Sequence, residues 1–361
     1  MDEKSDILLN AKAIQAIPAL SFSEGARAAF MREAFLSIGI EHVSSDDTGN
    51  VYAHIQGGAL PPLILSAHLD CVISDPAPLK LEGTCLVGAG IGDNALGLAT
   101  LLHLAEHYHA NPSDLRGDLW LIANVCEEGL GNLQGIHKVV ERFGGKVNAY
   151  IALEGIGLGT VQQGALGINR FKIEVSTKGG HAWNQFGCPS AIHEIVRLAS
   201  QLGNLKLPSE PRTSLNIGMI DGGDSINTLA SHAEMLVEIR SEEFETLKAL
   251  SGIVNKTVIA CNSNEVEVKI SEIGTRPSGR LSQNHPLIQK AVKALKETGV
   301  RAVLVTSSTD ASLPISLGYP ATCLGITTGG AAHSKEEFID LQMIQTGIRQ
   351  ITNLIKQVWE T

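Results

Sequence analysis

The order of strand-like and helix-like segments changes near residue 166, and this change restricts the fold more than any other feature of the chain. Before it, apolar runs such as "LPPLILSAHLD" and "VNAYIALEG" alternate with helix-like runs, which is the pattern of an α/β protein. Over 166–274 the expected order becomes β-α-β-β-α-β, the split βαβ unit of ferredoxin-like domains. The helix-like run "HPLIQKAVKALKETG" and the strand-like run "ATCLGITT" then resume the first pattern.

We therefore predict an α/β domain with a central mixed sheet, formed by residues 1–165 and 275–361 and interrupted by an inserted ferredoxin-like α+β domain at 166–274. A chain of 361 residues is long for one core and suits two domains. Its 37 glycines and 4% aromatic residues agree with the many tight turns of α/β proteins.

The net charge indicates which binding partners suit the protein, and the cysteine pattern indicates its cellular compartment. The formal net charge is -10 without a compensating basic run, which argues against nucleic acid and anionic membranes as partners. We see no secretion signal in "MDEKSDILLN" and no apolar run near the ~20 residues of a membrane span. The six cysteines are scattered without a C-x-x-C pair, as in a reducing compartment, so we expect a cytoplasmic protein.

Histidines and acidic residues follow three strand-like runs in the first half of the chain. They are His68 and Asp70, then Glu127 and Glu128, then Glu154. Ligands of open α/β sheets bind beyond the carboxyl ends of the strands, so we expect these side chains on one rim. His68 and Asp70 are two residues apart on a strand end, which directs both side chains to the same face.

Two glycine-rich segments add residues of the same chemistry, Asp93 in "GAGIGDNALG" and His333 in "TTGGAAHSKEEF". The candidate metal ligands are His68, Asp93, Glu128, Glu154 and His333. Imidazole and carboxylate ligands without thiolate suit zinc, or else cobalt or manganese. Neighbouring side chains on a strand diverge, so one of the two adjacent glutamates can hold a metal while the other faces a water.

The glycine-rich turn also fits a different motif. Gly90, Gly92 and Ala95 match G-x-G-x-x-A, the loop that places a dinucleotide pyrophosphate on a helix N-terminus. In that arrangement Asp93 would face a pyrophosphate of like charge at close range. We therefore favour a turn whose glycines bring Asp93 to a metal.

The following helix-like run contains a second competing motif. His103, Glu106 and His107 spell H-x-x-E-H, a zinc-protease pattern. On a helix these residues fall mainly opposite the apolar stripe that includes Leu98 and Leu102. We expect them on a solvated face.

Seven blocks of the sequence together resemble the signature blocks of one enzyme family. In order they are "LSAHLDCV", "GAGIGDNALG", "CEEGLGNLQG", "IALEG", "STKGGHAWN", "GGDSINTLASHAEMLVEIRS" and "SSTDASLPISLGYPATCLGITTGGAAHSKEEF". They are similar to those of the zinc-dependent peptidase and deacylase family that includes tripeptide aminopeptidase, carboxypeptidase G, acetylornithine deacetylase and succinyl-diaminopimelate desuccinylase. The resemblance covers residues from about 60 to 340.

The resemblance implies a hydrolase of amide bonds with two divalent metal ions, zinc or else cobalt or manganese. Asp93 would bridge the ions. His68 and Glu154 would also hold one ion, and Glu128 and His333 the other.

The same resemblance implies roles for residues that do not hold metal. Asp70 would orient His68, and Glu127 would be the general base. His181, Asn227 and Arg240 match positions that contact the anionic end of the substrate or the developing oxyanion. The inserted domain would be a lid that pairs in a homodimer, where His181 can serve the partner's site.

The "EIRS" and "SSTDAS…GGAAHS" blocks look most like those of tripeptide aminopeptidase, which favours a peptidase for small peptides. A deacylase of N-acyl amino acids uses the same metal centre and is the alternative, and a metal-binding protein without turnover is a third possibility. Several residues depart from the family pattern. Asn94 stands where many relatives carry a second aspartate, Cys71 where threonine is usual, and Trp183 and Asn184 where small residues are common.

Overall fold

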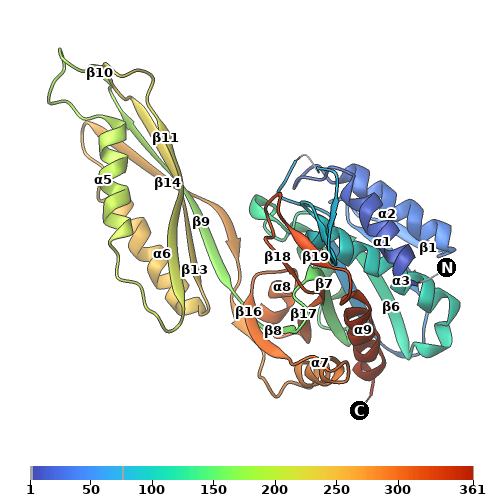
Figure 1. Cartoon of the computed structure of the whole chain (residues 1–361). Coiled ribbons are helices and arrows are strands. Elements are labelled where there is room, and N and C mark those ends of the chain that lie inside the picture. Colours follow the sequence, from blue (N-terminus) through green and yellow to red (C-terminus); the bar gives the residue numbers. More distant parts are fainter. Residues whose placement is uncertain (1–2, 75–76, 361) are drawn as a thin grey trace. The chain divides into compact units, whose positions relative to one another are not determined.

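The computed structural model describes residues 3–74 and 77–360 of the chain. These residues form two compact units. One is Leu166–Gly279, and the other consists of the described residues before and after it (Figure 1). The predicted class, an α/β fold with a central mixed sheet and an inserted α+β unit, is confirmed. The expected end of the insertion, residue 274, falls inside the last strand of the second unit.

The first unit is built on a nine-stranded mixed sheet of order β1-β2-β6-β3-β7-β17-β8-β15, with β16 paired to β8. The strands are β1 (His42–Ser45), β2 (Val51–Ile55), β3 (Leu60–His68), β6 (Gly117–Asn124), β7 (Ala149–Ile156), β8 (Thr160–Ala165), β15 (Gly279–Arg280), β16 (Val303–Ser307) and β17 (Ala321–Thr327). The central strands β6, β3, β7 and β17 run parallel, so their carboxyl ends lie at one rim. Their mostly buried residues match the continuous apolar runs of the sequence.

A small antiparallel sheet of order β18-β19-β5-β4 lies in the same unit. Its strands are β4 (Lys80–Glu82), β5 (Cys85–Val87), β18 (Gly329–Gly330) and β19 (Phe338–Asp340). β19 pairs with β5, with Phe338 opposite Val87. This pairing brings the segment before residue 340 beside the segment that leads into residue 93, although they are far apart in sequence.

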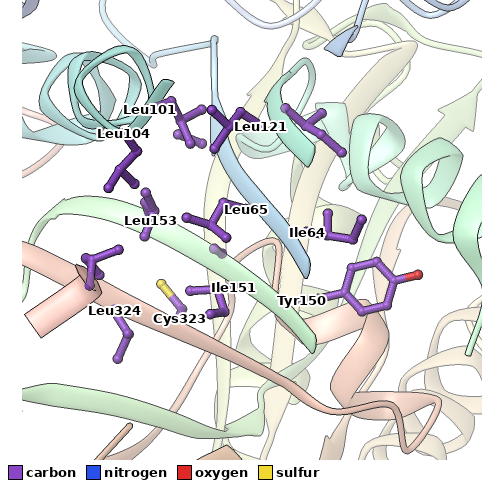
Figure 2. Packing of buried hydrophobic residues seen from close by; sticks show 14 of the residues in the cluster. Ile64, Leu65, Leu101, Leu104, Leu121, Tyr150, Ile151, Leu153, Cys323 and Leu324 are labelled. Carbon is purple, nitrogen blue, oxygen red and sulfur yellow. The ribbon is translucent and has the colours of Figure 1, made fainter. Parts of the chain in front are cut away.

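Helices complete the first unit. They are α1 (Glu3–Gln15), α2 (Gly25–Ile38), α3 (Leu96–Ala110), α4 (Gln134–Phe143), α7 (Pro286–Lys296), α8 (Ser312–Ser316) and α9 (Ile344–Val358). α3 packs on β3, β6 and β7, and its side chains Leu101 and Leu104 lie close to the labelled residues of the central strands, such as Leu65 and Leu153 (Figure 2). α7 and α9 pack on each other and on β17. This core fixes the rim where the parallel strands end.

The second unit is a four-stranded antiparallel sheet of order β11-β13-β9-β14 with two helices. Its strands are β9 (Gly167–Thr177), β11 (Thr213–Gly222), β13 (His232–Ser241) and β14 (Val266–Arg276), with α5 (Ala191–Gly203) after β9 and α6 (Phe244–Ile259) after β13. A separate two-stranded pair joins β10 (Gly180–His181) and β12 (Thr228–Leu229). The main elements follow the predicted β-α-β-β-α-β order.

Two features differ from the sequence prediction or add to it. Helix α1 was not predicted, because its short run of mixed apolar and charged residues gives a weak helical pattern. Glu24 occupies the N-cap of α2 without a side-chain cap bond. Among the described residues, we find no helix with the length and apolar character needed to span a membrane.

Candidate metal centre

The first half of the site combines residues from two neighbouring parallel strands. His68 is the last residue of β3, and Glu154 lies near the end of β7. Ser66 pairs in register with Ala152, so the residues two places further on lie level and on one face. His68 Nε2 is 3.6 Å from Glu154 Oε2.

Asp93 lies between two histidines. It belongs to an irregular turn, Ile91–Ala95, that precedes α3. Its Oδ1 is 3.0 Å from His68 Nε2, and its Oδ2 is 3.0 Å from His333 Nε2. A carboxylate with each oxygen facing a separate imidazole has the geometry needed to bridge two cations.

Glu128 and His333 form the second half of the site. Glu128 follows the end of β6, and His333 lies in the loop between β18 and β19. His333 Nε2 is 2.9 Å from Glu128 Oε1. Ligand atoms of His68, Asp93 and Glu128 all lie within 4.8 Å of one another. The five candidate ligands therefore form two histidine–glutamate pairs that share Asp93.

The electrostatics of these pairs suit the binding of cations. Burial lowers the pKa of His68, but the charge of Glu154 contributes to raising it well above its ordinary value. Hydrogen bonds with Asp93 and Glu128 raise the pKa of His333 to about 10. Burial raises the pKa of Glu154 to about 7 although His68 opposes the shift. Each histidine thus faces acidic side chains that favour a positive charge at its ring, and a divalent cation can take that place when the histidine loses its proton.

Asp70 connects three segments at the site. Its carboxylate is fully buried, and His68 Nδ1 lies 2.9 Å from its backbone carbonyl oxygen and 3.5 Å from its Oδ1. Oδ1 accepts the N–H of Glu127 at 2.9 Å, and Oδ2 accepts the N–H of Glu128 at 2.9 Å. The Ser21 hydroxyl donates to Oδ2 at 2.6 Å. Asp70 therefore holds the histidine ring mainly through its backbone oxygen and the backbone of the adjacent glutamates through its carboxylate.

Further buried side chains hold this frame, although the sequence did not indicate them. Glu24 accepts the N–H of Cys126 at 2.9 Å, and Arg27 donates to the Leu69 carbonyl oxygen at 2.7 Å. Their partners are backbone groups of distant segments, and no sequence motif marks such contacts. They support the two strand ends that carry His68 and Glu127.

The glycine-rich turn does not offer a dinucleotide site. The N–H groups of Gly90, Gly92 and Asp93 donate to the buried Glu337 carboxylate at 3.0, 2.6 and 2.9 Å. These are groups that a dinucleotide loop would present to a pyrophosphate. Because these N–H groups already donate to the Glu337 carboxylate, they are not available to a pyrophosphate, and the turn serves to position Asp93.

The H-x-x-E-H motif lies on α3, outside the site. Leu98 and Leu102 are buried, whereas Glu106 is exposed and His103 and His107 are half-buried. This arrangement confirms the predicted apolar stripe with the motif mainly on the other face.

His181 and Asn227 belong to the second unit and lie near each other. His181 pairs with Thr228 in the β10–β12 ladder, and the N–H of Ala182 donates to the Asn227 carbonyl oxygen at 2.9 Å. His181 is exposed, and its Nδ1 accepts the backbone N–H of Trp183 at 3.2 Å. An accepting Nδ1 places the ring proton of the neutral histidine on Nε2.

Arg240 lies near the end of β13 in the second unit. Its Nε is 2.6 Å from Glu238 Oε1, and Glu238 Oε2 also pairs with Arg170 Nε at 2.8 Å. Its side chain is 42% exposed, so the ion pair leaves much of it accessible to solvent.

These features define an α/β fold on a mixed sheet with a two-part site suited to cations, and the comparisons with known proteins identify its family. The family model for peptidase family M20/M25/M40 matches residues 64–357. The chain belongs to this family of hydrolases, which cleave amide bonds as peptidases or deacylases and depend on metal ions.

Individual relatives agree with this assignment. A succinyl-diaminopimelate desuccinylase of Corynebacterium glutamicum is 25% identical over 313 residues, covering 84% of this chain and 82% of that protein. A tripeptidase structure from Staphylococcus aureus has a TM-score of 0.80 at 20% identity and covers 98% of both chains. A dinuclear-metal-binding peptidase of Bacillus subtilis has a TM-score of 0.71 at 18% identity and covers 99% of both chains. At these identities the structural likeness shows the fold.

Proposed function

We propose that this protein hydrolyses amide bonds with two divalent cations, one at each histidine–glutamate pair, bridged by Asp93. The observation that carries the proposal is the position of Asp93, whose two oxygens each face a different histidine at 3.0 Å. The donor set of nitrogen and oxygen atoms suits zinc, which we propose as the native metal, and also accepts cobalt or manganese. The Bacillus subtilis neighbour is itself described as a dinuclear-metal-binding peptidase.

The chemistry divides between the cations and the side chains. When bound, the cations polarise the amide carbonyl and lower the pKa of the attacking water. Glu127 is our proposed general base: it is buried, its N–H is held by Asp70, and it would move a proton from the water to the leaving nitrogen. Asp70 would keep the Nε2 of His68 directed toward Asp93.

The second unit would recognise the substrate. We propose that His181 donates a hydrogen bond from Nε2 to the developing oxyanion, because its Nδ1 is already an acceptor. Arg240 would pair with a substrate carboxylate, and Asn227 would contact the same end of the substrate.

The proposed substrates are small peptides, as for a tripeptide aminopeptidase. The Staphylococcus aureus neighbour is a tripeptidase, which supports this choice. An N-acyl amino acid deacylase is the second candidate, and the desuccinylase relative favours it because its alignment covers most of both chains. Both reactions need the same metal centre, so the choice depends on the pocket for the substrate.

We further propose a cytoplasmic homodimer that pairs through the second unit, with His181 completing the partner's site. The six cysteines are all free, which supports a reducing compartment. The second unit also exposes large apolar side chains, Trp183 at 84%, Phe186 at 90% and Ile226 at 103%, as expected of a surface that pairs.

The test is hydrolysis after reconstitution with zinc, cobalt or manganese, measured on a panel of dipeptides, tripeptides and N-acyl amino acids. Turnover of tripeptides above N-acyl amino acids would support the peptidase, and the reverse order the deacylase. Cation binding without turnover of any amide would favour a metal-binding protein and overturn the proposed activity.

A further inference from the structure

The turn that carries Asp93 is held from two sides by buried side chains that are not candidate ligands. Glu337 contacts the turn from the segment that contains His333, and Asn94 contacts β7 beside Glu154. The relative exposed areas of Glu337 and Asn94 are 1% and 0%. Each side chain therefore ties Asp93 to a different half of the site.

Glu337 connects Asp93 to the half that contains His333. Its Oε1 accepts the N–H groups of Gly92 and Asp93, and its Oε2 accepts the N–H of Gly90. Its backbone oxygen accepts the N–H of Gly88 at 2.7 Å. His333 is four residues earlier in the same segment, so these bonds set how far His333 stands from Asp93.

Asn94 connects Asp93 to the half that contains Glu154. Its Nδ2 donates to the Leu153 carbonyl oxygen at 2.8 Å, and its Oδ1 accepts the N–H of Gly155 at 3.1 Å. These two backbone groups flank Glu154. Asn94 thus forms hydrogen bonds with β7 on both sides of the candidate ligand Glu154. The residue before it, Asp93, is the proposed bridging ligand.

The chemistry of both side chains is specific. Three N–H donors converge on Glu337, and a glutamine would turn an NH₂ group toward at least one of them. Asn94 must donate on one side and accept on the other, and an ionised aspartate cannot donate. An aspartate here would also add a buried carboxylate next to Asp93 and Glu154, a costly like-charge arrangement.

We infer that Glu337 and Asn94 are positioning residues of the metal centre, each for one cation. Glu337 sets the half formed with Glu128 and His333, and Asn94 sets the half formed with His68 and Glu154. The inference rests on the proposed function, because it needs a protein that binds two cations. Changes to residues that orient metal ligands cost about 10- to 100-fold in affinity, and we expect this range for one cation in each case.

The first experiment titrates metal-free protein with zinc and measures both dissociation constants and the number of bound ions. Glu337→Gln should weaken one ion about 10- to 100-fold and leave the other near its wild-type affinity. Glu336→Gln, the same change at the exposed neighbouring residue, is the matched control and should leave both ions unchanged. Circular dichroism confirms that the variants are folded, and Glu337→Asp, which keeps the charge, should lie between wild type and Glu337→Gln.

The second arm tests the opposite half. Asn94→Asp should weaken one ion in the same range, and Asn94→Ser, without the added charge, should do so to a lesser degree. Asn204→Asp is the control, because Asn204 is exposed and its Nδ2 also donates to a backbone carbonyl, that of Ser200. Wild-type affinities in Glu337→Gln and Asn94→Asp would overturn the inference.

Combined variants assign each effect to its half. Glu128→Gln removes a ligand of one cation, and Glu154→Gln removes a ligand of the other. Glu337→Gln should weaken the remaining ion when it is added to Glu154→Gln and should have little effect when it is added to Glu128→Gln. Asn94→Asp should show the opposite pattern, and equal effects in both backgrounds would contradict the division.

The two levels of proposal fail differently. A wild-type protein that binds no cation in the titration contradicts the proposed function itself. A wild-type protein that binds two cations and hydrolyses amides, with unchanged binding in the variants, contradicts only the positioning roles.

Discussion

The predicted site residues of the two units differ in how firmly the chain holds them. In the first unit, His68, Asp70 and Glu128 are buried and His333 is exposed, and all four take partners from segments distant in sequence. In the second unit, His181 and Arg240 are exposed or half-exposed, and their side chains contact residues two or three places away. Buried polar groups need fixed partners, whereas exposed ones can change theirs. The protein itself therefore sets the geometry for cations, and the groups proposed for the substrate keep freedom to adapt.

The largest expected effect concerns the two adjacent glutamates of the first unit, Glu127 and Glu128. Glu127→Gln keeps the shape and removes the proposed base, so both ions should stay bound while kcat falls by about 100-fold or more. Glu128→Gln should instead lower the metal content per chain, and excess metal should recover part of the activity. Metal analysis and steady-state kinetics on the two variants measure both effects. Loss of an ion from Glu127→Gln, with both ions kept in Glu128→Gln, would show that the roles are reversed.

The next largest effect tests whether His181 of the second unit acts in the site of the partner subunit. His181→Ala and Glu127→Gln chains, each nearly inactive alone, are unfolded and refolded together. In a hybrid dimer one site has both residues intact, so activity should return to about a quarter of wild type at equal mixing. No return of activity, although hybrid dimers are detected, would place His181 in the site of its own chain. A fully active monomer in sedimentation would remove the dimer from the proposal.

Arg240 gives a smaller effect. Arg240→Ala should raise KM by about 10-fold for substrates with a free carboxylate, the scale of a charge-assisted hydrogen bond, and change it little for amidated analogues. Glu238→Gln is the matched control, because it breaks the ion pair but keeps the arginine. If this control reproduces the Arg240→Ala result, or if amidated substrates lose as much, Arg240 has a structural role.

The smallest expected effect concerns Ser21, which helps to hold Asp70 in the first unit. Ser21→Ala removes the 2.6 Å hydrogen bond to Asp70 and should weaken cation binding by up to about 10-fold, the low end for residues behind the ligands. Ser23→Ala changes an exposed serine of the same segment and should have no effect. Zinc titration of the two variants provides the comparison, and equal affinities would mean that the two glutamate N–H groups suffice to hold Asp70.

The sequence predicts the parts of this molecule that depend on local pattern. Apolar runs indicate the buried parallel strands, and the acids and histidines after them indicate the rim where His68, Asp93, Glu128, Glu154 and His333 meet. The resemblance to the family supplies the roles of Glu127 and the second-unit residues, which stay predictions. Glu337 and Asn94 could not be found in this way, because their partners are backbone groups that only the packed structure brings within reach.

His68, Glu127 and Glu128 are all held by Asp70, and this limits how such a metal centre can be transferred to another protein. A designer who copied only the ends of β3, β6 and β7 onto another sheet would transfer every proposed ligand except Asp93 and His333. The copy would nevertheless lack the hydroxyl of Ser21, which comes from the connection between α1 and α2 and completes the partners of Asp70. The N-terminal helices, remote from the ligands in sequence, therefore belong to the smallest fragment that could be grafted with its geometry intact.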